Sequence, residues 1–133
     1  MTNDALLNYA QHHGHEVFYA DLQDTTSITI EKNGCYIALS KHMTSVEEKE
    51  CLAHELGHCE YGGFYNRYSK HDIRAKTERR ADKWAYRKLV PPREVKEAFQ
   101  RGIVEPWDLA DIFEVSCEYM QRVLNYYQQV AII

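Results

Sequence analysis

The chain places two histidines, His54 and His58, four residues apart in a segment that carries strong helix signals. Thr44 followed by Glu47 forms a capping box, which predicts a helix that runs to about residue 60, where Gly62-Gly63 ends it. At about 100° per residue, both imidazoles leave the same face of this helix, one turn apart. Two neutral imidazoles placed in this way can bind the same zinc ion. The segment is therefore expected to fold as a helix with a metal-ligand face.

The other positions of this helix divide between chemistry and packing. Glu55 falls at the edge of the ligand face, where it can reach a water on the metal without being a ligand itself. Gly57 costs about 1 kcal/mol relative to Ala in a helix, so its place beside the histidines predicts a close approach by a partner helix or a further ligand. The opposite face is expected to pack against the core, because it carries the apolar residues Leu52, Leu56 and Cys59.

A second helix is expected over residues 70–89, since Pro91-Pro92 prevents its continuation. Glu78 and Asp82 share one stripe of this helix with small and apolar residues, namely Ala75, Ala81, Ala85 and Leu89. Burying an unpaired carboxylate is costly, and a cation is the usual remedy. We therefore expect Glu78 to be the third metal ligand and Asp82 to accept the free N–H of a ligand histidine. In the alternative interpretation, both acids pair with neighbouring Arg or Lys on a surface.

Three protein ligands leave the fourth position of a zinc ion for water, which is the arrangement of a catalytic site. Zinc would acidify that water, and Glu55 would take its proton for attack on a peptide carbonyl. The sequence therefore predicts a zinc endopeptidase. A competing ligand set, Cys51 with His54 and His58, also converges on one helix face and would make a closed structural or regulatory site. Cys51→Ala separates the two, because only the closed site would lose zinc.

The rest of the chain predicts an α+β domain with a small antiparallel sheet, an N-terminal helix and a mainly helical C-terminal half. Asn33-Gly34 is a strong hairpin signal between two segments rich in β-branched and aromatic residues, Thr26–Lys32 and Cys35–Leu39. The further expected elements are a helix over 3–12, a strand over 15–20, and helices over 92–101, 106–114 and 117–129. At 133 residues, these elements are expected to form a single domain, 1–133, with helices 92–129 packed on it.

Composition bears on the location of the protein, the state of its cysteines and the role of its basic segment. No stretch nears the roughly 20 apolar residues of a membrane span, and the N-terminus lacks the pattern of a signal peptide, so we expect a cytoplasmic protein. The four cysteines form no Cys-x-x-Cys pair and are expected to be small buried hydrophobic residues rather than disulfides. Twelve of the sixteen Lys and Arg lie in residues 67–101, which we interpret as a solvated helix face.

Three motifs, taken in order, resemble the ImmA/IrrE family of metallopeptidases over roughly residues 44–126. They are His54-Glu55-Leu56-Gly57-His58, Glu78-Arg79-Arg80-Ala81-Asp82-Lys83-Trp84-Ala85 and Leu89-Val90-Pro91-Pro92. The resemblance implies a gluzincin-like fold, zinc on His54, His58 and Glu78, and Glu55 as the general base. It also implies a substrate class, helix-turn-helix transcriptional repressors, and an anti-repressor role in a prophage or mobile element.

The resemblance does not assign the residue that stabilises the oxyanion or the surface that binds substrate. Tyr61, Tyr65, Tyr68 and His71 lie between the motifs and are candidates for the first role. For the second role, an extended peptide could pair with the Cys35–Leu39 strand by β-augmentation.

Two functions of other classes remain open. Residues 109–124 resemble a helix-turn-helix, but the helix over 117–129 has Arg122 as its only base and also carries Glu118. Phosphate neutralisation supplies most non-specific affinity for DNA, so packing is the expected role of this helix and we expect no direct binding of nucleic acid. A non-proteolytic zinc protein that inactivates a repressor by binding it would keep the same metal motif. Glu55→Gln separates this binder from a peptidase, because only the peptidase needs the base.

Overall fold

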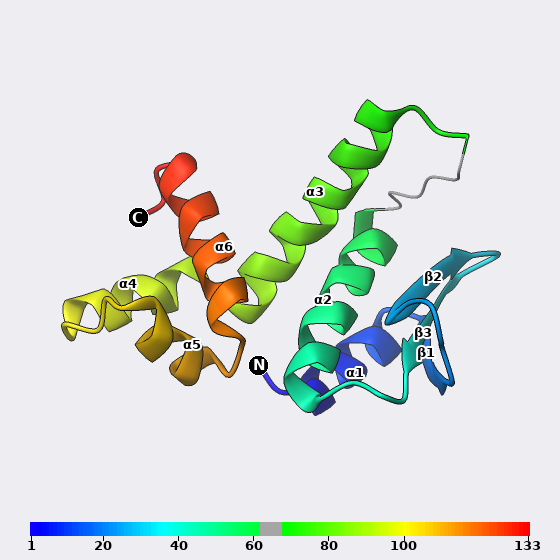
Figure 1. The fold of residues 1–133 in the computed structure, drawn as a ribbon, viewed down its shortest axis with the longest axis horizontal. Helices are drawn as coiled ribbons and strands as arrows, with labels where there is room; N and C mark the ends of the chain where they lie inside the picture. Colours follow the sequence, from blue (N-terminus) through cyan, green and yellow to red (C-terminus); the bar gives the residue numbers. More distant parts are fainter. Residues whose placement is uncertain (62–67) are drawn as a thin grey trace. The chain divides into compact units, whose positions relative to one another are not determined.

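The computed structural model describes residues 1–61 and 68–133, and its elements follow the expected order (Figure 1). The expected helix stop at Gly62-Gly63 lies outside the described residues. The elements are α1 (Asn3–His12), β1 (His15–Ala20), β2 (Ser27–Glu31), β3 (Cys35–Ser40), α2 (Ser45–Tyr61), α3 (His71–Leu89), α4 (Pro92–Gln100), α5 (Pro106–Phe113) and α6 (Cys117–Gln129). The α+β class is confirmed.

Backbone contacts divide the chain into two compact units, Met1–Ala85 and Tyr86–Ile133. The first unit holds α1, the sheet, α2 and most of α3, and therefore all of the residues proposed above for chemistry. The packing of helices 92–129 on the rest of the chain stays a prediction. Among the helices of the described residues, none combines the length and apolar character that crossing a bilayer requires.

The three strands form a mixed sheet in the order β1-β3-β2. β2 and β3 pair antiparallel through the expected hairpin, with φ of 54° at Asn33 and 141° at Gly34. β1 pairs with β3 in parallel, so the expectation of an antiparallel sheet was wrong for this strand. The chain reverses between β1 and β2 and again between β2 and β3, so β1 and β3 run the same way. They become neighbours because β3 takes the central position.

The central position of β3 also decides where an extended peptide can be added. β3 pairs with β1 from Cys35 to Ser40 and with β2 from Cys35 to Leu39. Both of its edges are therefore occupied, and the prediction that substrate pairs with Cys35–Leu39 was wrong. In the described sheet the edge strands are β1 and β2.

The core of the first unit is formed where α1 and α2 pack with the sheet. α2 begins with the expected cap, in which the Thr44 hydroxyl accepts a hydrogen bond from the backbone N–H of Glu47 at 3.2 Å. The Asn3 side-chain amide donates to the Ser45 carbonyl at 3.0 Å and so connects the starts of α1 and α2. The largest fully buried side chains of this core are Leu6, Ile37, Leu39, Leu52 and Leu56.

Cys35 and Cys59 form a disulfide, with their Cα atoms 5.8 Å apart. The expectation that the cysteines are unlinked buried residues was therefore wrong for this pair. Cys35 begins β3 and Cys59 lies in the last turn of α2, so the fold brings together two residues that 24 positions separate. Cys51 and Cys117 are free thiols, but Cys51 is half-buried and Cys117 is exposed, so the expectation of burial was wrong for these two.

The second unit contains the end of α3 with α4, α5 and α6. The Tyr127 hydroxyl donates to the Val90 carbonyl at 2.6 Å and fixes the segment between α3 and α4. Arg122, the only base of α6, lies with its guanidinium 5.4 Å from the centre of the Tyr119 ring. This contact supports the expected role of α6 in packing, because the base that would meet a phosphate stacks on a side chain of its own helix.

Candidate metal centre

α2 presents the two histidines as its sequence predicts. The ring centres of His54 and His58 are 4.8 Å apart, and the ring planes are nearly perpendicular at 83°. Their Nε2 atoms lie 3.2 Å from each other. On the opposite face of the helix Leu52 and Leu56 are fully buried, so the packing of this apolar face turns the ligand face toward α3.

α3 places Glu78 against both imidazoles. Its Oε2 lies 2.7 Å from Nε2 of His54, and its Oε1 lies 3.3 Å from Nε2 of His58. The three side chains therefore converge on one point, each with an atom that can donate an electron pair. His54, His58 and Glu78 form one of the clusters among the described residues that could hold a metal ion.

The close approach of α2 and α3 depends on Gly57, where the two helices lie side by side (Figure 1). A Cβ atom at this position would lie 2.6 Å from the carbonyl oxygen of Ala81 and 2.8 Å from its Cα. Contacts this short do not occur between real side chains and backbone, so only glycine fits. The expectation that Gly57 makes room for a partner helix is confirmed, and the partner is the helix that carries Glu78.

Asp82 lies one turn beyond Glu78 and contacts the far side of the His54 ring. Its Oδ1 is 2.8 Å from Nδ1 of His54, and a carboxylate can only accept, so Nδ1 carries the proton. Nε2 of His54 is therefore left with the lone pair that faces Glu78. Burial alone would lower the pKa of His54, but its hydrogen bond to Asp82 and the charges of Asp82, Glu78 and Glu55 outweigh it, and the pKa is raised.

The spacing of these donor atoms suits a tetrahedral ion. Bonds of about 2.0–2.1 Å at tetrahedral angles separate ligand atoms by roughly 3.3 Å. The distances of 3.2 Å between the imidazole Nε2 atoms and 3.3 Å from His58 to Glu78 match this separation. The 2.7 Å between His54 and Glu78 is shorter and would have to open slightly. Without a cation or a proton the converging lone pairs would repel, so the donor set fits a divalent metal.

Glu55 has a partner that the sequence did not indicate. Its side chain is buried, and its carboxylate accepts a hydrogen bond from the hydroxyl of Thr29 on β2. This bond fixes the carboxylate, whose charge is one of those that raise the pKa of the neighbouring His54. No local pattern joins the two residues, because 26 positions separate them and only the packing of α2 on β2 brings them together.

Among the described residues, the other sequence candidates are exposed or face another partner. The Cys51 thiol points to the Thr26 hydroxyl, 3.5 Å away, and the cluster contains Glu78 in place of the cysteine. Tyr61 and Tyr68 are 58% and 80% exposed, and Tyr65 lies outside the described residues. His71 is also exposed, at the start of α3.

Comparison with known families agrees with this geometry. A family model described as the IrrE N-terminal-like domain, a peptidase family, matches residues 10–125. The chain belongs to this family. No curated protein matches it.

The match to the IrrE N-terminal-like domain is broader than the resemblance seen in the motifs. It begins within α1, covers the whole sheet and both helices of the cluster, and ends within α6. The sheet and Thr29 are therefore part of the family domain, as the helices with the histidines and Glu78 are. The family supports a peptidase and hence a protein substrate.

Proposed function

We propose that this member of the IrrE-like peptidase family is a zinc-dependent endopeptidase. The observation that carries the proposal is the convergence of His54, His58 and Glu78 beside the buried carboxylate of Glu55. Two imidazoles and one carboxylate are a common ligand set of catalytic zinc, and they leave one coordination position for water. In this assignment His54, His58 and Glu78 hold the metal, and Asp82 orients His54.

Bound zinc would supply the Lewis acidity that activates water and polarises the substrate carbonyl. The residues of the chain control the proton and the geometry. Glu55 accepts the proton of the attacking water and delivers it to the departing amine. The Thr29 hydroxyl holds the Glu55 carboxylate in place. Asp82 keeps the proton of His54 on Nδ1, so that Nε2 remains a ligand atom.

The position of Thr29 also suggests how an extended substrate reaches the site. β2 is an edge strand, so its outer side can accept a peptide by β-augmentation. The Ser40 N–H donates to the Thr26 carbonyl, and alternation along an antiparallel pair then directs the amide of Glu31 outward. Glu31→Pro removes this amide where an edge strand tolerates proline. Cleavage should weaken in a folded variant, and unchanged cleavage would exclude this binding edge.

The proposed substrate is a helix-turn-helix repressor, and the proposed setting is the cytoplasm, where such a repressor acts. The resemblance to ImmA/IrrE metallopeptidases supports this substrate class and an anti-repressor role in a prophage or mobile element. The test is incubation with the helix-turn-helix repressor encoded beside this chain, comparing the wild type with Glu55→Gln. We expect the wild type to cut the repressor. Glu55→Gln should keep its zinc and lose at least about 100-fold in cleavage rate.

The same experiment separates the peptidase from the repressor-binding alternative. A protein that acts by binding alone would release the repressor from its operator equally well with Glu55→Gln. That result, obtained with zinc retained in both proteins, would overturn the proposed hydrolysis. Chelation of the metal provides the control, because it should abolish cleavage while circular dichroism shows that the helices remain.

A further inference from the structure

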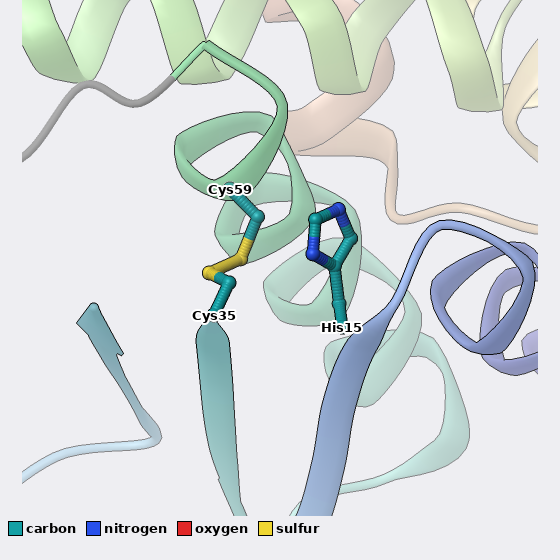
Figure 2. Close-up of side chains that lie close together, drawn as sticks. All are labelled: His15, Cys35 and Cys59. Atoms are coloured by element: carbon teal, nitrogen blue, oxygen red, sulfur yellow. A yellow bond between two sulfur atoms is a disulfide. The ribbon is translucent and has the colours of Figure 1, made fainter. Parts of the chain in front are cut away.

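A second group of metal-ligating side chains lies at the far end of α2 (Figure 2). His15 begins β1, Cys35 begins β3 and Cys59 lies in the last turn of α2. One ligand atom from each lies within 4.8 Å of the others. The two sulfur atoms are joined as a disulfide, and the His15 ring stands beside it with a nitrogen on the side of the sulfurs.

The orientation of His15 is that of a metal ligand. Its Nε2 lies 3.2 Å from Oε1 of Glu60, and its side chain is only 14% exposed. The carboxylate accepts the Nε2 proton, so the lone pair of the neutral ring is on Nδ1. Ligand histidines commonly give their second N–H to a carboxylate in this way. A disulfide that only cross-links β3 and α2 would not require this arrangement of His15 and Glu60.

We propose that Cys35, Cys59 and His15 form a second zinc site when the disulfide is reduced. Two thiolates and one imidazole are a soft donor set that favours zinc over hard cations. This site shares no ligand with the cluster of His54, His58 and Glu78, and it rests on no part of the proposed peptidase activity. It would join the starts of β1 and β3 to the end of α2 through the metal instead of through the sulfur–sulfur bond.

The redox state of the pair decides which of the two links is present. A dithiol reductant opens the bond between Cys35 and Cys59, leaving two protein thiols and the disulfide of the reductant. Binding of Zn²⁺ then releases the two thiol protons and forms two zinc–thiolate bonds. An oxidant that accepts two electrons reverses the process, restores the disulfide and releases the ion. The site is therefore a metal site under reducing conditions and a covalent cross-link under oxidising conditions.

Cobalt(II) substitution tests this inference on the whole chain. Thiolate ligands give cobalt an intense near-ultraviolet charge-transfer band, whereas the cluster of His54, His58 and Glu78 contains no sulfur. The protein reduced with a dithiol should show this band, and the disulfide form should not. Thiol titration checks the two states, because Cys51 and Cys117 are the free thiols of the oxidised form. A reduced protein that has four titratable thiols and no band would overturn the proposal.

Variants assign the band to individual residues. Cys35→Ser and His15→Ala should lose it. Glu60→Gln should weaken cobalt binding by about 10–100-fold, because Glu60 acts through the His15 ring and is not itself a ligand. Cys51→Ser and Cys117→Ser are the matched controls and should keep it. His15→Ala retains both cysteines, and circular dichroism shows whether this variant keeps its helices. A band that persists in Cys35→Ser or disappears in Cys51→Ser would place the thiolate ligands elsewhere and contradict the site.

Discussion

Gly57→Ala tests the contact that sets Glu78 against the two histidines. The added Cβ would lie 2.6 Å from the Ala81 carbonyl oxygen, where ordinary van der Waals contact begins at 3.4 Å. The obstacle is backbone, which cannot rotate away, so α3 would have to move by about 0.8 Å, the difference between these distances. Zinc–ligand distances tolerate only about ±0.2 Å, so this shift is large enough to remove Glu78 from the metal.

The magnitudes predict a specific combination of effects. Alanine gains about 1 kcal/mol over glycine in helix propensity, and overpacking a close contact costs about 1–3 kcal/mol. The free energy of unfolding should therefore fall by no more than about 2 kcal/mol, leaving the variant folded. A misplacement near 1 Å can cost about 100-fold in catalysis. We expect zinc affinity to weaken by at least tenfold and peptidase activity to fall further.

The assay is zinc titration by competition with a chromophoric chelator, combined with thermal unfolding of each variant. Arg80→Ala is the control for an alanine substitution at an exposed position of α3 and should bind zinc like the wild type. Ala81→Gly added to Gly57→Ala should not restore binding, because the close contacts are to the backbone of Ala81. The reasoning would be refuted if Gly57→Ala bound zinc normally and melted at a higher temperature.

Two further predictions concern the neighbours of the cluster. Thr29→Val should leave zinc content unchanged and reduce kcat by about tenfold or more. The substitution removes a hydrogen bond to the buried Glu55 carboxylate, and such a bond contributes about 1.5–3 kcal/mol. Loss of zinc or an unchanged kcat would count against the role of Thr29. In the metal-free protein the raised pKa of His54 means that its protonation contributes stability below pH 6.5, which is lost as pH rises through the raised value. Melting temperatures of chelator-treated protein, measured against pH, should show this loss of stability. The pH dependence should be weaker in Asp82→Asn. An identical pH dependence in the wild type and in Asp82→Asn would contradict the role of Asp82 in raising the pKa of His54.

The sequence predicted what local periodicity determines. Histidines four residues apart must share a helix face, and Glu78 and Asp82 must share a stripe with Ala81, so helical spacing proposed the members of the cluster but left Cys51 as a competing ligand. The cap at Thr44 and the Asn33-Gly34 turn are also local, and the structure has both.

The sequence did not predict the pairings that depend on distant segments. The order of the strands follows from which strand the core places at the centre, and alternation along a strand does not encode that choice. The Thr29–Glu55 and Cys35–Cys59 contacts join residues 26 and 24 positions apart, and both connect the sheet to α2. Spacing along one helix carries no information about them.

Anomalous diffraction at the zinc absorption edge, on crystals of the zinc-loaded protein, tests the central claim most directly. We expect a zinc peak at about 2.0–2.2 Å from Nε2 of His54, Nε2 of His58 and one carboxylate oxygen of Glu78, with Glu55 beside it but not bound. A zinc ion between the histidines that takes its third ligand from Cys51, or a Glu78 side chain turned away from the two rings, would contradict the account.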